Sequence, residues 1–199
     1  MSRGVALRSL GQLAGDAVPA EVSAEARAVI REAMQSREGA LRRGGIDAAG
    51  NARSESFVPE LSAALDDSDA HTRAAAAHAL RGVPRVTAQP LLAARLARED
   101  DRDVRAELAT TLAENARGTF DDATVRAAAA ALLRSPEVPV RAQVIRLLGA
   151  AAPTHALARE ALAAWVPREA QPELVQLIGQ FLDLPTMREA LRRRAEHPP

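Results

Sequence analysis

Residues 59–82 read PELSAALDDSDAHTRAAAAHALRG, which predicts a helix, an acidic turn and a second helix. The first helix carries apolar residues at helical spacing over Leu61–Leu65, and the run Asp66–Asp69 ends it. The second helix is expected to begin near His71 and to bury one face as far as Leu80. Two short helices cannot bury their apolar faces alone, so further copies of this unit should be present.

Copies of the unit recur along the chain. In this unit the second helix begins with Arg73, and Leu80 follows seven residues later. In the other copies an apolar or small residue stands seven residues after the leading residue, except in the last copy, where it stands eight residues after. The leading residues are Arg3, Arg42, Arg73, Arg105, Arg141 and Glu173, at intervals of 39, 31, 32, 36 and 32 residues. Two helices per period at so regular a spacing are typical of an α-solenoid.

The first helix of each pair is predicted between these leading residues, over Ser23–Met34, Phe57–Leu65, Ala88–Arg98, Ala123–Leu133, Ala156–Trp165 and Met187–Arg194. The last of them follows a capping-box pattern, Thr186-x-x-Glu189, which predicts Thr186 as its N-cap. The second helix over about Ala40–Ala52 contains Gly44 and Gly45, each of which costs about 1 kcal/mol relative to Ala. We therefore expect this helix to be the weakest, and neighbouring helices to approach most closely there.

Composition favours an all-α fold. Of the 199 residues, 46 are Ala, the best helix former, whereas Tyr is absent, Phe occurs three times and Trp once. The prediction is a right-handed α-α superhelix of about five helical pairs, forming a single domain over residues 1–199. The segment Arg3–Leu13 reads as a second helix with no first helix ahead of it, so we expect either that the chain is a C-terminal fragment of a longer array or that a partner covers this end.

Several classes of protein are disfavoured by the sequence. The absence of Cys excludes disulfides, thiolate metal sites and cysteine nucleophiles. Met1–Leu10 lacks the pattern of a signal peptide, and no apolar run reaches the length of a membrane span, so we expect a soluble, cytoplasmic protein. If an upstream targeting segment has been removed, the protein would instead be secreted or periplasmic.

The stretch Pro59–Ala152 resembles HEAT repeats of the short bacterial type. The family pattern has a Pro in the first helix, an Asp in the turn and Val-Arg at the start of the second helix; here these are Pro59, Asp67 and Thr72-Arg73. Later copies are less regular, and the third has Ser135 at the acidic position. The resemblance implies a hydrogen-bonded ladder between successive repeats, built from Asp67, Arg73, Glu99, Arg105 and Arg141.

Two other families remain as alternatives. Ala79–Leu112 is similar to the helical domain of large lipid-transfer, vitellogenin-like proteins, which would imply a lipid ligand and secretion. A family of DNA glycosylases also uses HEAT-like repeats, which would imply a DNA-binding or DNA-repair enzyme. Binding to nucleic acid requires a clustered basic face, whereas 26 Arg are balanced here by 26 acidic residues, so nucleic acid is not the expected partner.

No motif for catalysis or for a cofactor is present. His71 and His78 lie seven residues apart, not at the i, i+4 spacing of a zinc helix with its Glu. The nucleophile elbow, the Walker A loop and the Gly-rich dinucleotide loop are all missing. We therefore expect no enzyme activity, no catalytic residue, no cofactor and no metal.

A candidate binding surface remains on the second helices. Positions five and two residues after the leading Arg should recur on one face, which in the resembled repeat type is concave. These residues, which we call the polar stripe, are Arg8, Asp47, His78, Glu107, Thr110, Gln143 and Arg146. The prediction is a non-enzymatic scaffold that binds another protein there, because solenoids use such extended surfaces for binding.

Overall fold

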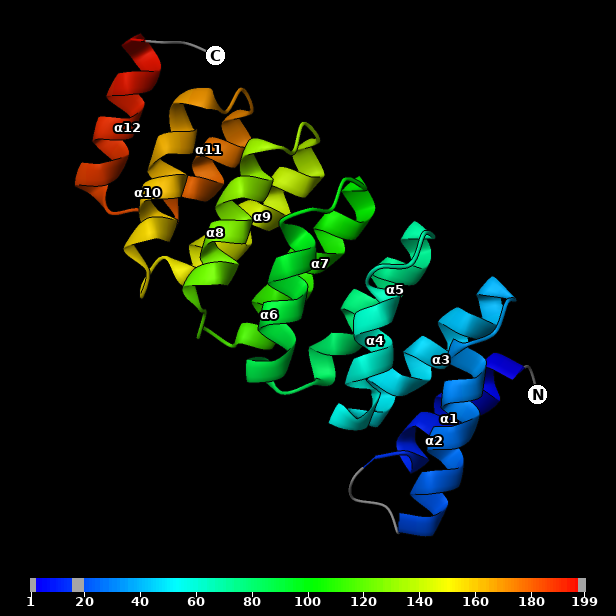
Figure 1. Ribbon diagram of the computed structural model, residues 1–199. Coiled ribbons are helices and arrows are strands. Elements are labelled where there is room, and N and C mark those ends of the chain that lie inside the picture. Colours follow the sequence, from blue (N-terminus) through cyan, green and yellow to red (C-terminus); the bar gives the residue numbers. More distant parts are fainter. Residues whose placement is uncertain (1–2, 16–19, 197–199) are drawn as a thin grey trace.

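The structure is a computed structural model that describes residues 3–15 and 20–196, and within these residues it is helical with no strand (Figure 1). The α-helices are α1 (Arg3–Leu13), α2 (Ala20–Met34), α3 (Gly39–Ala52), α4 (Val58–Ala64), α5 (Ala70–Ala79), α6 (Arg85–Leu96), α7 (Arg102–Ala116), α8 (Asp122–Leu133), α9 (Val138–Ala151), α10 (Ala156–Trp165), α11 (Pro172–Gly179) and α12 (Leu184–Glu196). Three short 3-10 helices extend them, η1 (Glu55–Phe57), η2 (Leu80–Gly82) and η3 (Val166–Arg168). The predicted all-α solenoid is confirmed. Within the described residues five helical pairs, from α2/α3 to α10/α11, lie between α1 and α12.

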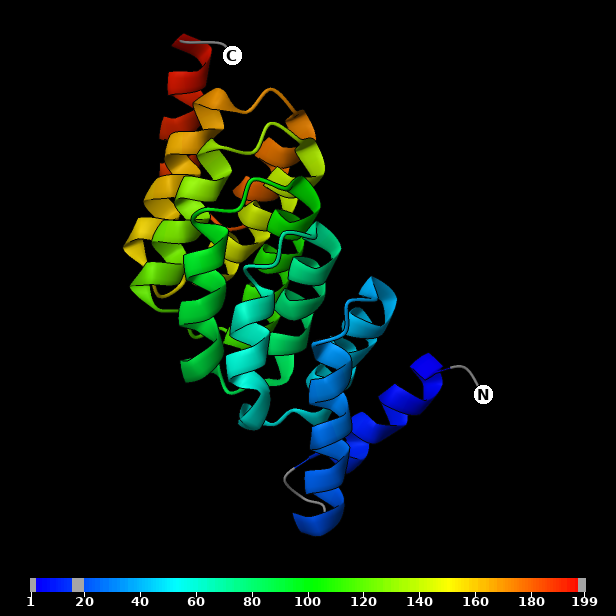
Figure 2. The ribbon, with the colours of Figure 1, turned by 45° about the vertical axis from the view of Figure 1, so that its right-hand side comes forward.

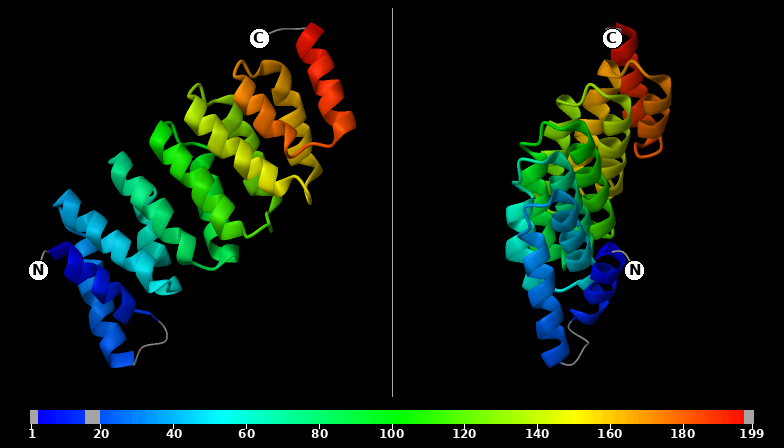
Figure 3. Two further views of the ribbon diagram at one scale, coloured as in Figure 1. Left: turned by 180° about the vertical axis from the view of Figure 1, so that it is seen from behind. Right: turned by 90° about the vertical axis from the view of Figure 1, so that its right-hand side faces the viewer.

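The helices form two layers. Figure 3 (left) shows α1, α3, α5, α7, α9 and α11 side by side, and each of them contacts the next. On the opposite side (Figure 1), α6, α8, α10 and α12 pack in succession. Figure 2 shows α1 and α12 at opposite ends of the array. The layer that begins with α1 and α3 is called the second-helix layer below, because it contains the second helix of every pair.

One apolar core runs through the array. Leu80, Leu112 and Leu148, which the repeat spacing places at equivalent positions, are all fully buried in it. The core extends from Leu7 in α1 to Ala190 in α12. Each pair therefore covers the apolar flank of its neighbour, as stacking of repeats requires.

Aspartate side chains cap the start of two second helices, α5 and α7. The Asp69 carboxylate accepts hydrogen bonds from the N–H groups of His71 and Thr72 and from the Thr72 hydroxyl, at 3.3, 3.2 and 2.7 Å. Asp101 caps α7 in the same way, through the Asp103 and Val104 N–H groups. A side-chain acceptor at this position satisfies donors that have no partner within the helix. The bond from the Thr72 hydroxyl is the largest cause that lowers the pKa of Asp69, to about 2.

Helix α12 begins three residues earlier than predicted, so the assignment of Thr186 as its N-cap is wrong. The Asp183 carboxylate accepts from the Thr186 N–H at 2.8 Å, which makes Asp183 the capping residue. Pro185 is tolerated in this first turn because its missing N–H would have no helical partner. The Asp183 carboxylate keeps a lowered pKa mainly through this backbone hydrogen bond.

Helix α3 packs closely against its neighbours through glycine. A Cβ atom on Gly45 would lie 2.6 Å from the Met34 nitrogen and 2.9 Å from the Ala33 carbonyl carbon, both of which are backbone atoms. A Cβ atom on Gly44 would meet only the Leu7 Cδ1 atom, at 3.2 Å, at the end of a flexible side chain. The glycine that lowers the helix propensity at position 45 is therefore also what lets α2 and α3 touch.

This difference gives a matched test. Gly45→Ala should lower the free energy of unfolding by about 2 kcal/mol, because the backbone of α2 must shift to make room. Gly44→Ala gains the same helix propensity without that clash, so its stability should be unchanged or raised by up to about 1 kcal/mol. Urea unfolding followed by circular dichroism measures both variants. Equal effects of the two substitutions would contradict the close approach.

Candidate functional site

The polar stripe lies on the second-helix layer. Asp47, His78 and Arg146 are exposed, on α3, α5 and α9, while Glu107, Thr110 and Gln143 are partly buried. The side chain of Arg8 lies outside the described residues. The side chains of Arg146 and Gln143 make no hydrogen bond or ion pair to another described residue. Three of the six stripe members whose side chains the structure describes are thus exposed at the surface.

His78 and Glu107 are brought together across α5 and α7. The His78 Nδ1 atom lies 3.0 Å from Glu107 Oε1, which also accepts from the Thr111 hydroxyl at 3.1 Å. Arg81 Nη2 lies 3.1 Å from His78 Nε2, and Arg81 Nη1 pairs with Glu114 at 3.1 Å. A neutral imidazole that donates from Nδ1 and accepts at Nε2 satisfies this arrangement. Sequence reasoning missed Arg81, which completes the network.

Thr110 does not present its hydroxyl to a partner. Its Oγ1 donates to the Ala106 carbonyl oxygen at 2.9 Å, one turn earlier in α7. This local bond is common for Thr inside helices. The hydroxyl proton of Thr110 is therefore already used within α7, and the group can act toward a partner only as an acceptor.

Arg73 joins one repeat to the next. Its Nε and Nη2 atoms donate to the two oxygens of Glu99 at 3.0 and 2.9 Å, and Nη1 donates to the carbonyl oxygens of Asp67 and Ser68. Glu99 is 1% exposed and also accepts from Arg95 and from the Asp101 N–H. Burial alone would raise the pKa of Glu99, but the hydrogen bonds from Arg73, the Asp101 N–H and Arg95 outweigh it and lower the pKa from 4.5 to about 2.

Arg141 makes the same link two repeats later, to an acid that sequence reasoning missed. Its Nε and Nη2 atoms donate to Glu169 at 2.8 and 2.9 Å, and the Glu169 side chain is fully buried. Glu169 also accepts from the Trp165 indole at 2.9 Å and from the Gln171 N–H at 3.0 Å. Burial opposes its ionisation, but the bonds from Arg141, Gln171 and Trp165 prevail, so the pKa of Glu169 is lowered.

The link is weaker at the other two repeats. Arg105 donates to the Arg134 carbonyl oxygen at 2.7 Å and lies 3.5 Å from the Glu137 carboxylate. Asp67 lies 3.4 Å from Arg42 of the preceding repeat. All the residues expected in the ladder thus lie at contacts between repeats or within the turns beside them.

A shared position explains where the acids lie. Asp67, Glu99 and Glu169 each stand two residues before the N-cap of a second helix and accept its backbone N–H. Ser135 occupies this place before α9 and bonds to Ala131 instead. The sequence separation of two residues between each acid and the N-cap of the next helix is therefore the signal that would have identified Glu169.

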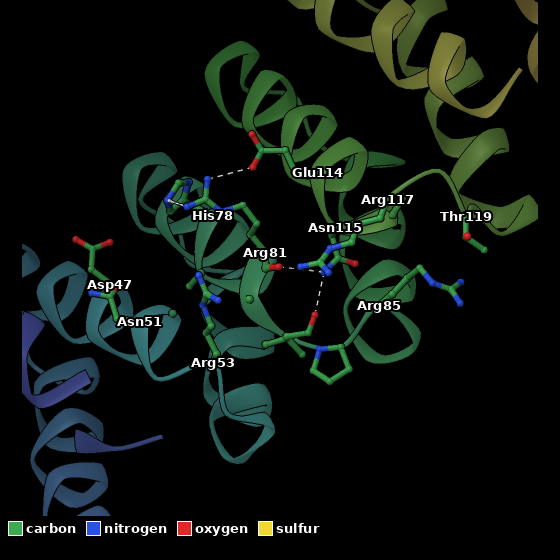
Figure 4. A pocket seen from close by; sticks show the side chains of 16 residues that line it. Asp47, Asn51, Arg53, His78, Arg81, Arg85, Glu114, Asn115, Arg117 and Thr119 are labelled. Atoms are coloured by element: carbon green, nitrogen blue, oxygen red, sulfur yellow. Dashed lines mark hydrogen bonds and ion pairs between the residues drawn. The ribbon is translucent and has the colours of Figure 1, made fainter. Parts of the chain in front are cut away.

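A groove opens at one end of the second-helix layer (Figure 4). It has a volume of about 840 Å³ and is lined by the C-terminal ends of α3, α5 and α7, by η2 and by the start of α6. Asp47 and His78 of the polar stripe are among the lining residues, so groove and stripe are continuous. The charged groups that line it are Asp47, Arg53, His78, Arg81, Arg85, Glu114 and Arg117.

Neither a membrane span nor a metal cluster is found in the described chain. None of the helices in residues 3–15 and 20–196 is long and apolar enough to cross a bilayer. Across the same residues, no three His, Asp or Glu side chains are grouped so that they could hold a metal ion.

Comparison with known proteins agrees with this architecture. Residues 26–113, from α2 into α7, match the family model described as HEAT repeats. No curated protein matches the sequence. The chain is similar to the crystal structure of an engineered protein, with a TM-score of 0.54 and 19% identity over 98% of this chain and 89% of the other. At that identity the likeness shows the fold alone. Residues 26–113 are therefore similar to HEAT repeats, and the helical pairs of the described residues are stacked as an α-solenoid.

Proposed function

We propose that this protein is a non-enzymatic scaffold that binds another protein on its second-helix layer. HEAT repeats are generally protein-interaction scaffolds. The observation that supports the proposal here is the polar stripe, whose members carry both signs of charge and come from successive second helices, with Asp47, His78 and Arg146 exposed. Such a surface contacts a partner over several repeats at once.

The contacts within the stripe support binding rather than catalysis. His78 is held between Glu107 and Arg81, so its two ring nitrogens are already engaged. Arg146 projects from α9 without a partner among the described residues, which leaves a cation for an acidic group of the partner. No observation favours the lipid-carrier or DNA-repair alternatives over this proposal.

Arg146→Glu tests the proposal, with Arg126→Glu as its matched control. Arg126 lies on α8, in the other layer, and is 64% exposed. The tagged protein and both variants would be used to capture partners from the source cells, followed by quantitative mass spectrometry and by Kd measurement with the purified partner. We expect the Arg146 variant to bind about tenfold more weakly, because a charge reversal at an interface adds repulsion as it removes attraction.

Circular dichroism should show equal helicity for the wild type and both variants. If no captured protein depends on Arg146, or if Arg126→Glu weakens binding equally, the proposed binding face is wrong.

A further inference from the structure

Three arginines in the groove have no partner of their own. The side chains of Arg53, Arg85 and Arg117 make no hydrogen bond or ion pair to another described residue, although each lines the groove (Figure 4). They recur at intervals of 32 residues, once per repeat. Of the two carboxylates in the lining, Glu114 is already paired with Arg81. The groove therefore carries an excess of positive charge in a chain whose formal net charge is zero.

Two of these arginines occupy backbone positions that favour glycine. Arg53 and Arg117 end α3 and α7 with φ angles of 50° and 45°, in the left-handed region. A side chain is disfavoured there, and glycine is the common residue at such helix ends. Stability alone therefore does not account for arginine at either position.

Arg53 is also held in place by packing. A Cβ atom on Gly82 would lie 2.9 Å from Arg53 Cγ, so the stem of Arg53 passes directly over this glycine in η2. The stem bridges the ends of two successive second helices while the guanidinium group remains in the groove. A cation positioned before binding loses less side-chain freedom when its ligand arrives.

We propose that this groove binds an extended acidic segment of the partner protein, an inference that rests on the proposed function. Carboxylates form bidentate hydrogen bonds with guanidinium groups, and three such groups in successive repeats can be met by side chains on one side of an extended chain. The continuity of the groove with Asp47 and His78 lets one partner contact groove and stripe together.

The lining favours an acidic peptide over nucleic acid. No Phe, Tyr or Trp side chain lines the groove, whereas proteins that bind single strands stack bases on such aromatic rings. Asp47 and Glu114 at its border would repel a continuous phosphate chain. The other polar groups, including Asn51 and Thr119, are suited to the backbone of a peptide.

The test uses a fluorescent peptide of about ten residues that alternates Glu and Ser, with fluorescence anisotropy at about 50 and about 200 mM salt. We expect saturable binding that Arg85→Glu weakens by about tenfold and that the control Arg126→Glu leaves unchanged. No binding to the wild type, or equal binding to Arg85→Glu, would overturn the proposal. Displacement of the peptide by inorganic phosphate, or by a single-stranded oligonucleotide of equal charge at lower concentration, would also overturn it.

Two further variants separate binding from folding. Arg53→Gly and Arg117→Gly should each weaken binding of the peptide, while the midpoint of thermal unfolding stays the same or rises by about 2–4 °C because the backbone strain is relieved. Weaker binding accompanied by a fall in this midpoint would show that the arginines act only in folding, against the proposal.

Capture of the partner distinguishes this inference from the proposed function. If Arg146→Glu loses the partner but Arg85→Glu retains it, the groove proposal fails and the scaffold function stands. If the peptide binds in the groove but no captured protein depends on Arg146, the binding face proposed for the scaffold fails and the groove remains an acidic-peptide site.

Discussion

Glu169→Gln should lower the free energy of unfolding by about 3–5 kcal/mol, the usual cost of breaking a buried ion pair from one side. The carboxylate of Glu169 is fully buried and receives hydrogen bonds from Arg141, Trp165 and the Gln171 N–H. A neutral amide keeps the size of the side chain but leaves the Arg141 guanidinium, which is 10% exposed, without a counter-charge. Urea unfolding followed by the fluorescence of Trp165, the only Trp, measures the loss at the site itself.

An exposed carboxylate supplies the control. Glu189 pairs with Arg192 and Arg193 on α12 but is 46% exposed, so Glu189→Gln should cost at most about 1 kcal/mol. A double-mutant cycle of Glu169→Gln with Arg141→Met then gives the interaction energy of the pair. Similar losses for Glu169→Gln and Glu189→Gln would mean that the Arg141–Glu169 pair contributes no more than a surface pair.

The stability contributed by Glu99 should disappear in acid. Its pKa is about 2 in the folded state against 4.5 for an unperturbed carboxyl, so the unfolded state binds more protons as the pH falls. The contribution is therefore fully present above about pH 4.5 and is lost as the pH falls toward 2. A shift of this size corresponds to about 3 kcal/mol.

Comparison with Glu99→Gln isolates this effect from other carboxylates. The wild type should be more stable than the variant by about 3 kcal/mol near neutral pH, and the difference should narrow as Glu99 becomes protonated in the unfolded state below about pH 4.5. Urea unfolding at several pH values measures the difference. A difference that stays constant down to about pH 3 would show that Glu99 is not the group that titrates.

The architecture could be read from the sequence because the repeat is strongly periodic. The equivalent residues Leu80, Leu112 and Leu148 mark the core, and all three are buried together. Three first helices, α2, α6 and α12, begin three residues earlier than predicted. At α12 the reason is local, because the Asp183 carboxylate accepts a hydrogen bond from the Thr186 N–H group, so Asp183 and not Thr186 is the N-cap.

The site was harder to predict because contacts between repeats depend on small shifts in the turns. The partner of Arg141 is Glu169, which follows a 3-10 helix that the periodic pattern does not show. The groove combines Arg53, Arg85 and Arg117, which come from two helix ends and one helix start, outside the regular faces that periodicity describes. Their common interval of 32 residues was the available signal.

The pairing of arginine with the acid of the following repeat gives the array a direction. Glu99 is neutralised by Arg73 from the pair before it, and Glu169 by Arg141 in the same sense. A fragment that started at α6 would leave the buried Glu99 carboxylate with Arg95 as its remaining cation, whereas one that stopped after α5 would release Arg73 to water. Removing helical pairs from the N-terminal end should therefore destabilise the remaining array more than removing pairs from the C-terminal end. A helical pair transplanted into another array needs the arginine of the pair that precedes it.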